Sequence, residues 1–322
     1  MRRSAAGQTV EAMSRWRRRH RRKGLLYVAP ALLLFAVMIA YPIGRSFYLS
    51  LFDYSILEPD SARFVGASNY GRLLTQESNR LPFANTLYFT AVFVPPYVLG
   101  ALLIAMMLNA VRRGSTLLRT LIFTPVVVSL AVSAVMWTLF YNPSFGFAHK
   151  MLETVVGAVN AVAGLFGAEA PAAAPEAGVL GHPSWAMIAI AVMCLWNGIG
   201  VNVILFLVGL QRIPEELYEA AEVDGAAPRQ RFRHVTLPQL RPTVYLVVLL
   251  SMIGAFKVFG QPYIMTGGGP QDSTLTFVMR LYNLAFRYGK FQLGYASALA
   301  YSLAVFILVM SLLVRRLNRP VE

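Results

Sequence analysis

The sequence has 322 residues, of which 57% are of hydrophobic types and only 14% are charged, and its formal net charge is +14. A soluble domain usually carries about 25% charged residues, so this deficit excludes an ordinary water-soluble protein. Its one cysteine, Cys194, excludes an intramolecular disulfide and a cysteine metal cluster.

The apolar residues gather in six runs, each about as long as the roughly 20 residues that cross a bilayer as a helix. We therefore predict an all-α, polytopic membrane domain over residues 25–314, between a basic segment at 1–24 and a tail at 315–322. Prolines inside the first three runs predict kinked helices, because neighbouring helices can satisfy the carbonyls that a proline frees. The six predicted spans are Leu25–Phe47, Phe83–Leu108, Leu121–Phe140, Trp185–Leu210, Val244–Phe259 and Tyr295–Val314.

Lysine and arginine fall unevenly on the two sides of these spans. One side carries twenty, in residues 1–24, in the second and fourth connections and in the tail, and the other side carries seven. Cytoplasmic loops hold the excess of positive charge in membrane proteins, so both termini are expected in the cytoplasm. We interpret RWRRRHRRKG at residues 15–24 as an anchor that contacts anionic lipid headgroups. A cleaved signal peptide and a nucleic-acid-binding arm are the alternatives, and no nucleic-acid partner is expected.

The connection between the fourth and fifth spans, residues 211–243, contains start and stop signals for helices of its own. Pro214 followed by two acidic residues, the first of them Glu215, is typical of a helix start. The helix is expected to end at Asp224–Gly225, where glycine can adopt the left-handed conformation of a C-terminal cap.

The second half of this connection predicts a second helix. Pro228 would start a short basic helix that Leu237–Pro238 ends before the fifth span. The two helices would form an elbow on the cytoplasmic face. Ala220 and Ala221 would leave one face of its first helix open to close approach by another protein, and Glu219 would offer a carboxylate to a cation.

The spacing of Glu219-Ala220-Ala221, Gly225, Val235 and Leu237-Pro238 resembles the EAA loop of ATP-binding-cassette importer permeases, with valine in place of the usual isoleucine. The outer loops and first span are similar to carbohydrate-uptake permeases of the maltose and glycerol-3-phosphate type. The resemblance implies a type I importer permease whose loop, as a coupling helix, docks into a groove on a cytoplasmic ATPase. The implied coupling residues are Glu215, Glu219, Ala220, Ala221, Asp224, Gly225, Leu237 and Pro238.

The resemblance also implies partners: an ABC ATPase dimer, a second permease of different sequence, and an extracytoplasmic solute-binding protein, all at a bacterial inner membrane. The chain itself is expected to be no enzyme. None of its four lysines completes the phosphate-binding motif G-x-x-x-x-G-K-[ST]. We therefore expect no cofactor on this chain, with ATP bound by the partner, and the four histidines lack metal-ligand spacing.

Polar residues inside two spans suggest a path for the solute. An ionisable residue within a membrane is a functional candidate, and Lys257 lies in the fifth run. Sugar sites combine an aromatic face with amides, and the hypothesis is that Trp196, Asn197, Asn202, Lys257 and Gln261 face the pathway. Alternatively, Lys257 reaches the outer interface and the asparagines bond between helices.

The cargo and the transport class have alternatives as well. Because Lys257 carries a positive charge, an anionic solute such as a sugar phosphate is an alternative cargo, and amino acids or peptides are further candidates. A secondary transporter that works without an ATPase is the alternative from another class, although it would leave the EAA loop without a role.

Overall fold

The computed structural model describes residues 27–111, 114–165, 177–287, 289 and 291–317. The predicted basic segment 1–24 and most of the tail at 315–322 lie outside the described residues. Five described helices are long and apolar enough to cross a membrane, and a sixth span results if one sharply bent pair counts as one. The number of predicted spans therefore agrees with the structure.

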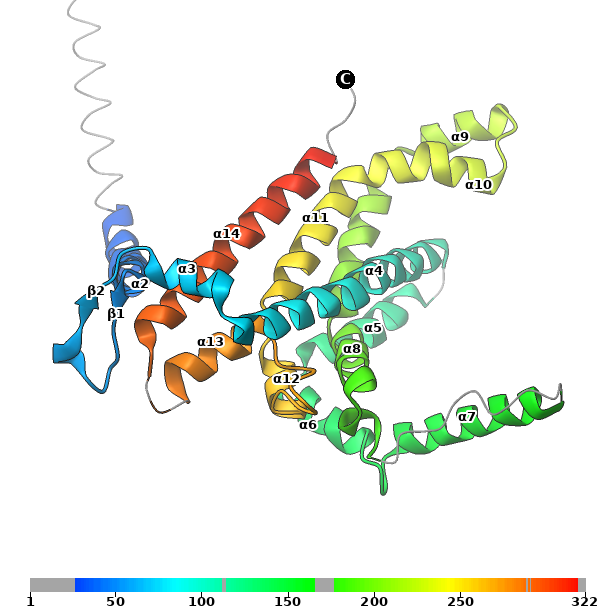
Figure 1. Cartoon of the computed structure of the whole chain (residues 1–322). Helices are drawn as coiled ribbons and strands as arrows, with labels where there is room; N and C mark the ends of the chain where they lie inside the picture. The colour runs from blue at the N-terminus through cyan, green and yellow to red at the C-terminus, as the bar shows by residue number, and fades with distance from the viewer. Residues whose placement is uncertain (1–26, 112–113, 166–176, 288, 290, 318–322) are drawn as a thin grey trace, which may run out of the picture.

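The first span runs over Tyr27–Ser50 and includes a π-helical segment, η1 (Ala36–Ala40), followed by α2 (Tyr41–Ser50). None of the residues in its most apolar window is buried. Figure 1 shows this helix at the side of the molecule, and its packing partner within the chain is α14 (Leu293–Leu317). The apolar faces of the first span are thus left to lipid or to another chain.

The loop that follows holds several short elements. Strands β1 (Phe52–Asp53) and β2 (Arg63–Phe64) pair antiparallel, with Phe52 opposite Phe64. The short helices of this loop are η2 (Pro59–Ser61), α3 (Ser68–Thr75) and η3 (Glu77–Asn79).

The centre of the bundle is formed by α4 (Arg80–Ala110), α8 (Pro183–Gln211) and α11 (Leu237–Phe256). These helices are apolar on nearly all sides, as expected for helices that are covered by protein on one face and by lipid on the other. Figure 1 shows the three crossing in the middle of the molecule. The buried side chains between them include Phe89, Ala101, Ile190, Phe206, Leu240 and Val247.

The predicted third span is broken rather than merely kinked. It consists of α5 (Ser115–Val127) and α6 (Leu130–Phe140), which meet at an angle of 94°. Pro125 removes an amide donor in the last turn of α5, and Val128 then adopts an extended conformation. Ser129 starts the new helix, because its Oγ accepts a hydrogen bond of 3.3 Å from the amide of Val132.

The predicted helix end at Leu237–Pro238 is wrong. The helix continues from α10 (Pro228–Arg231) through a π-helical turn, η5 (Phe232–Thr236), into α11. The amide of Leu237 bonds the carbonyl of Phe232, five residues back, and this widened turn accommodates the proline that follows. The fifth span, however, ends at Phe256 rather than at Phe259.

Four helices complete the described chain. The connections after the third and fifth spans contain α7 (Phe147–Leu165), α12 (Gly260–Met265) and α13 (Phe277–Phe286), together with the short η4 (Val179–Gly181). The remaining helix, α9 (Glu215–Val223), lies beside α10. In Figure 1, α9 and α10 project from the end of the bundle where α14 finishes, whereas α7 and α12 lie towards the opposite end.

Candidate functional site

A cavity of about 320 Å³ opens between α4, α8, α11 and the start of α12. It brings together Asn197, Asn202 and Gln261, three of the five residues predicted to face a solute pathway. Of the residues that the structure describes, none that lines the cavity carries a charged side chain. The complete lining is Phe89, Phe93, Tyr97, Cys194, Asn197, Gly198, Val201, Asn202, Leu250, Ser251, Gly254, Ala255, Val258 and Gln261.

One wall of the cavity is a strip of aromatic rings along α4. Phe89 stacks on Phe93 with ring centroids 5.2 Å apart, and Phe93 stacks on Tyr97 at 4.6 Å. The three residues are spaced by four, so they lie on one face of the helix. Gly198 faces the Tyr97 hydroxyl so closely that an added Cβ would lie 2.6 Å from its oxygen. The sequence-based hypothesis did not include this strip, although its spacing was visible in the sequence.

Asn197 lies where the cavity meets the break between α5 and α6. Its Nδ2 donates to the carbonyl of Pro125 at 2.9 Å and to Ser133 Oγ at 3.0 Å, and it lies 3.5 Å from the carbonyl of Val128. The carbonyls at a helix end have no partner within the helix. Asn197 therefore adds a second donor to the Pro125 carbonyl, which also accepts a hydrogen bond of 3.2 Å from the amide of Val128.

Asn202 joins two central helices. Its Nδ2 donates to Ser251 Oγ on α11 at 3.1 Å, and both residues are buried. Both asparagines thus bond between helices, as the alternative interpretation expected, and both also line the cavity. Ser251 is a further polar lining residue that the sequence-based hypothesis did not include.

The other two predicted pathway residues lie elsewhere. Trp196 points away from the cavity and packs against Trp137 on α6, with ring centroids 5.7 Å apart. Lys257 is the residue that follows the end of α11 at Phe256, and its side chain is exposed rather than turned into the cavity. The positive charge that made an anionic solute a candidate is therefore absent from the cavity wall.

A second break in the bundle lies beside the first. The chain leaves α11 after Phe256 and enters α12 at Gly260, where an added Cβ would lie 2.9 Å from Leu130 Cδ2 at the start of α6. Non-helical backbone at membrane depth is tolerated only where protein or a water-filled cavity surrounds it. The two breaks therefore contact each other, and Val258 and Gln261 place the second of them at the cavity wall.

The elbow predicted between the fourth and fifth spans is present and exposed. Helix α9 begins at Glu215, one residue later than predicted, and Gly225 follows it with a φ of 74°. The Tyr218 hydroxyl lies 3.0 Å from Thr236 Oγ1, which holds α9 against η5. Val223 is 88% exposed.

The predicted coupling residues lie on α9, on the turn after it and at the start of α11. Ala221 is half-buried, whereas the other seven are exposed: Glu215, Glu219, Ala220, Asp224, Gly225, Leu237 and Pro238. A nearby ion pair between Arg231 and Glu222, at 3.4 Å, joins α9 to α10. Helix α9 therefore exposes a small side chain, Ala220, together with carboxylates.

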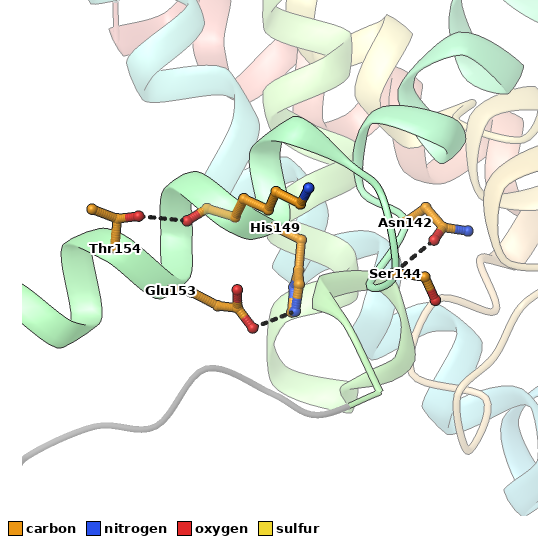
Figure 2. A network of polar contacts seen from close by, with 6 residues as sticks. Asn142, Ser144, His149, Glu153 and Thr154 are labelled. Atoms are coloured by element: carbon orange, nitrogen blue, oxygen red, sulfur yellow. Dashed lines mark hydrogen bonds and ion pairs between the residues drawn. The ribbon is translucent and has the colours of Figure 1, made fainter.

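The turn before α7 and the first turns of α7 hold polar contacts of a different kind (Figure 2). His149 Nε2 lies 3.3 Å from Glu153 Oε1, and the imidazole is buried. Asn142 Oδ1 accepts a hydrogen bond of 2.9 Å from the amide of Ser144. Among the described residues no group of three or more His, Cys, Asp or Glu side chains could hold a metal ion. The cluster fixes the turn and the first turns of α7.

Comparison with known proteins gives a consistent result. Residues 82–322 match the family described as "Binding-protein-dependent transport system inner membrane component". The lactose transport system permease protein LacF of Rhizobium radiobacter is 34% identical over 293 residues, which cover 90% of this chain and 92% of LacF. The trehalose/maltose transport system permease protein MalF of Thermococcus litoralis is 33% identical over 300 residues, which cover 92% and 93% of the two chains.

The fold has a match among solved structures. A chain of a bacterial ABC transporter involved in the import of the acidic polysaccharide alginate superposes with a TM-score of 0.71 and 22% sequence identity. The alignment covers 96% of this chain and 99% of the other. At this level of identity the match concerns the fold alone.

Proposed function

Because this chain belongs to the family of binding-protein-dependent transport system inner membrane components, we propose that its polar cavity is the passage for a neutral sugar or sugar-like solute. As a member of this family the chain is a multi-pass permease subunit of an ABC importer and not an enzyme. Its all-α fold is that of a type I importer permease.

The composition of the cavity wall carries the proposal of a neutral sugar. The Phe89–Phe93–Tyr97 strip offers flat apolar surface to the C–H face of a sugar ring. Asn202 and Gln261 offer amides to its hydroxyls. A phosphorylated or carboxylated solute would have to give up its hydration without gaining a cation on this wall. The relatives named for lactose and for trehalose and maltose support the same class of cargo.

We expect Gln261→Ala to raise the KM for uptake about tenfold, since one lost hydrogen bond to a bound hydroxyl corresponds to about 1.4 kcal/mol. Lys257→Ala is the matched control within the same broken span, and uptake should stay within twofold of the wild type. The measurement is uptake of radiolabelled lactose, maltose and trehalose by cells that express the complete transporter. A strong loss with Lys257→Ala and none with Gln261→Ala would place the passage elsewhere.

The exposed elbow supports a second part of the proposal: α9 docks on a separate ATPase, which binds ATP and supplies the energy. The chain then needs no cofactor of its own. A second permease of different sequence and an extracytoplasmic binding protein complete the importer. In this arrangement the elbow and both termini face the cytoplasm, as the excess of lysine and arginine on that side predicts.

Affinity purification of the tagged chain in mild detergent, followed by mass spectrometry, tests these partners. We expect an ATPase with a phosphate-binding loop and a second permease to co-purify, while the solute-binding protein is identified from binding to the reconstituted complex. A folded chain that purifies alone, and that takes up solute by itself in liposomes, would instead identify a secondary transporter.

A further inference from the structure

The break between α5 and α6 is held by one side chain from another helix. Asn197 on α8 is 72 residues from Pro125 in the sequence, yet its Nδ2 lies 2.9 Å from the Pro125 carbonyl. The same nitrogen reaches Ser133 Oγ at 3.0 Å, four residues into α6. One amide therefore bonds the end of one half-span and the beginning of the next.

The neighbouring atoms fix the orientation of this amide. The groups around Nδ2 are two carbonyl oxygens and a hydroxyl, and a carbonyl oxygen only accepts. The nitrogen, with its two hydrogens, must therefore face the break. Among the described residues no donor bonds Asn197 Oδ1, and the residue lines the cavity. The amide nitrogen therefore bonds both sides of the break, while the amide oxygen is available to a group in the cavity.

Close packing keeps α8 in register with this contact. Gly200 faces the backbone of α5, where an added Cβ would lie 2.6 Å from the carbonyl oxygen of Ile122. On the other side of the break, the Tyr141 hydroxyl donates to the carbonyl of Ala189 at 3.1 Å. Helix α8 therefore contacts both half-spans, and Asn197 lies between these two contacts.

We propose that Asn197 is a positioning residue that sets the bend between α5 and α6 and joins it to the wall of the solute cavity. The role of the cavity rests on the proposed function, whereas the bend itself does not. Without the Nδ2 donor, the carbonyl of Val128 and Ser133 Oγ lose the partner that α8 supplies, and the half-spans can change their angle. A solute hydroxyl that donates a hydrogen bond to Asn197 Oδ1 would therefore contact the same side chain that sets the bend.

The angle can be measured directly with two spin labels. Leu117 on α5 and Leu139 on α6 are 65% and 54% exposed, so both positions accept a label. At a rise of 1.5 Å per residue the two backbone positions lie about 20 Å apart in the bent arrangement and roughly 33 Å apart in a straight helix. The labels are attached to Leu117→Cys and Leu139→Cys in a Cys194→Ser background, and pulsed electron–electron double resonance gives the distance distribution.

We expect Asn197→Asp to shift or broaden this distribution towards longer distances, because a carboxylate would face two carbonyl oxygens and has lost both donor hydrogens. Asn197→Ala should act in the same direction without the added charge. The matched control is Asn202→Asp. Asn202 lies on the same helix and lines the same cavity, but its amide donates to Ser251 on α11 and not to the break, so the variant removes a comparable hydrogen bond elsewhere. Its distribution should remain that of the wild type, which separates positioning of the bend from general destabilisation.

Ser133→Ala keeps the inference testable if the Asn197 variants do not assemble. It removes one acceptor of the Asn197 Nδ2 hydrogen bonds and adds no charge. The distribution of label distances should therefore broaden only towards longer distances. The measurement is made on the purified complex in nanodiscs, or on the chain itself if it purifies alone, so it does not depend on the partners. Unchanged distances in Asn197→Ala and Ser133→Ala would overturn the inference. Lost uptake with an unchanged bend would leave Asn197 as a solute contact only.

Discussion

Replacement of Ala220 by tryptophan is expected to reduce solute uptake by at least tenfold while the protein remains inserted in the membrane. Ala220 is exposed on α9, and Val223, one turn further on, is 88% exposed. An ATPase that covers this surface would bury a large apolar area around a residue with a minimal side chain. An indole at this position would hold the two proteins apart, and overpacking of a buried contact is costly.

The measurement compares uptake with ATPase activity in the reconstituted complex. We expect the Ala220→Trp complex either to lose its ATPase during purification or to hydrolyse ATP without transport. Glu222→Gln is the control on the same helix, because it removes only an exposed ion pair with Arg231, and such pairs contribute little. Its uptake should stay within twofold of the wild type. Full uptake by Ala220→Trp would mean that the ATPase docks elsewhere.

Gly200→Ala is expected to lower the melting temperature of the purified protein by about 2–10 °C. The added methyl group would lie 2.6 Å from the carbonyl oxygen of Ile122 and 3.1 Å from the Cα of Phe123, both backbone atoms of α5. Since neither can rotate away, α5 and α8 must separate. Overpacking of this kind costs about 1–3 kcal/mol, which corresponds to the stated shift in a chain of this size.

Gly254→Ala is the matched control for this prediction. Gly254 also lies within a central helix, but an added Cβ would meet nothing within 4 Å. The same substitution should leave the melting temperature unchanged or raise it slightly, because alanine is the better helix former. Equal melting temperatures for the two variants would show that α5 and α8 are not packed as closely as the structure has them.

Two of the three central spans could be predicted from the sequence to within three residues. The predicted Phe83–Leu108 and Trp185–Leu210 correspond to α4 (Arg80–Ala110) and α8 (Pro183–Gln211). A long apolar run has few alternatives in a membrane, because every backbone polar group must be satisfied within the helix. Hydropathy alone therefore determines these elements.

The two breaks could not be predicted in the same way. Pro125 indicated a kink, but the 94° angle depends on a bond from Asn197, which is remote in sequence. The fifth span was predicted to reach Phe259, since the apolar residues Val258 and Phe259 follow a single charged residue, Lys257, but α11 ends at Phe256. Hydropathy measures whether a residue tolerates lipid and carries no information about where the helix stops.

The candidate site was predicted in part. Polar residues at Asn197, Asn202 and Gln261 were identified because polar groups are rare within spans, and the structure places all three in one cavity. Tyr97 was missed because aromatic residues are common in membrane helices and its spacing with Phe89 and Phe93 was not considered. Lys257 was chosen for its charge, but its orientation depends on the turn that ends α11.

The cavity between the broken spans has a consequence for the membrane as an electrical barrier. With a volume of about 320 Å³, it is large enough to hold several water molecules. If water fills this cavity beside the amides of Asn197, Asn202 and Gln261, the electrostatic cost of bringing an ion into the bilayer is lower there. The idle importer must therefore keep at least one end of the chamber closed, or the cell would lose its proton-motive force through it.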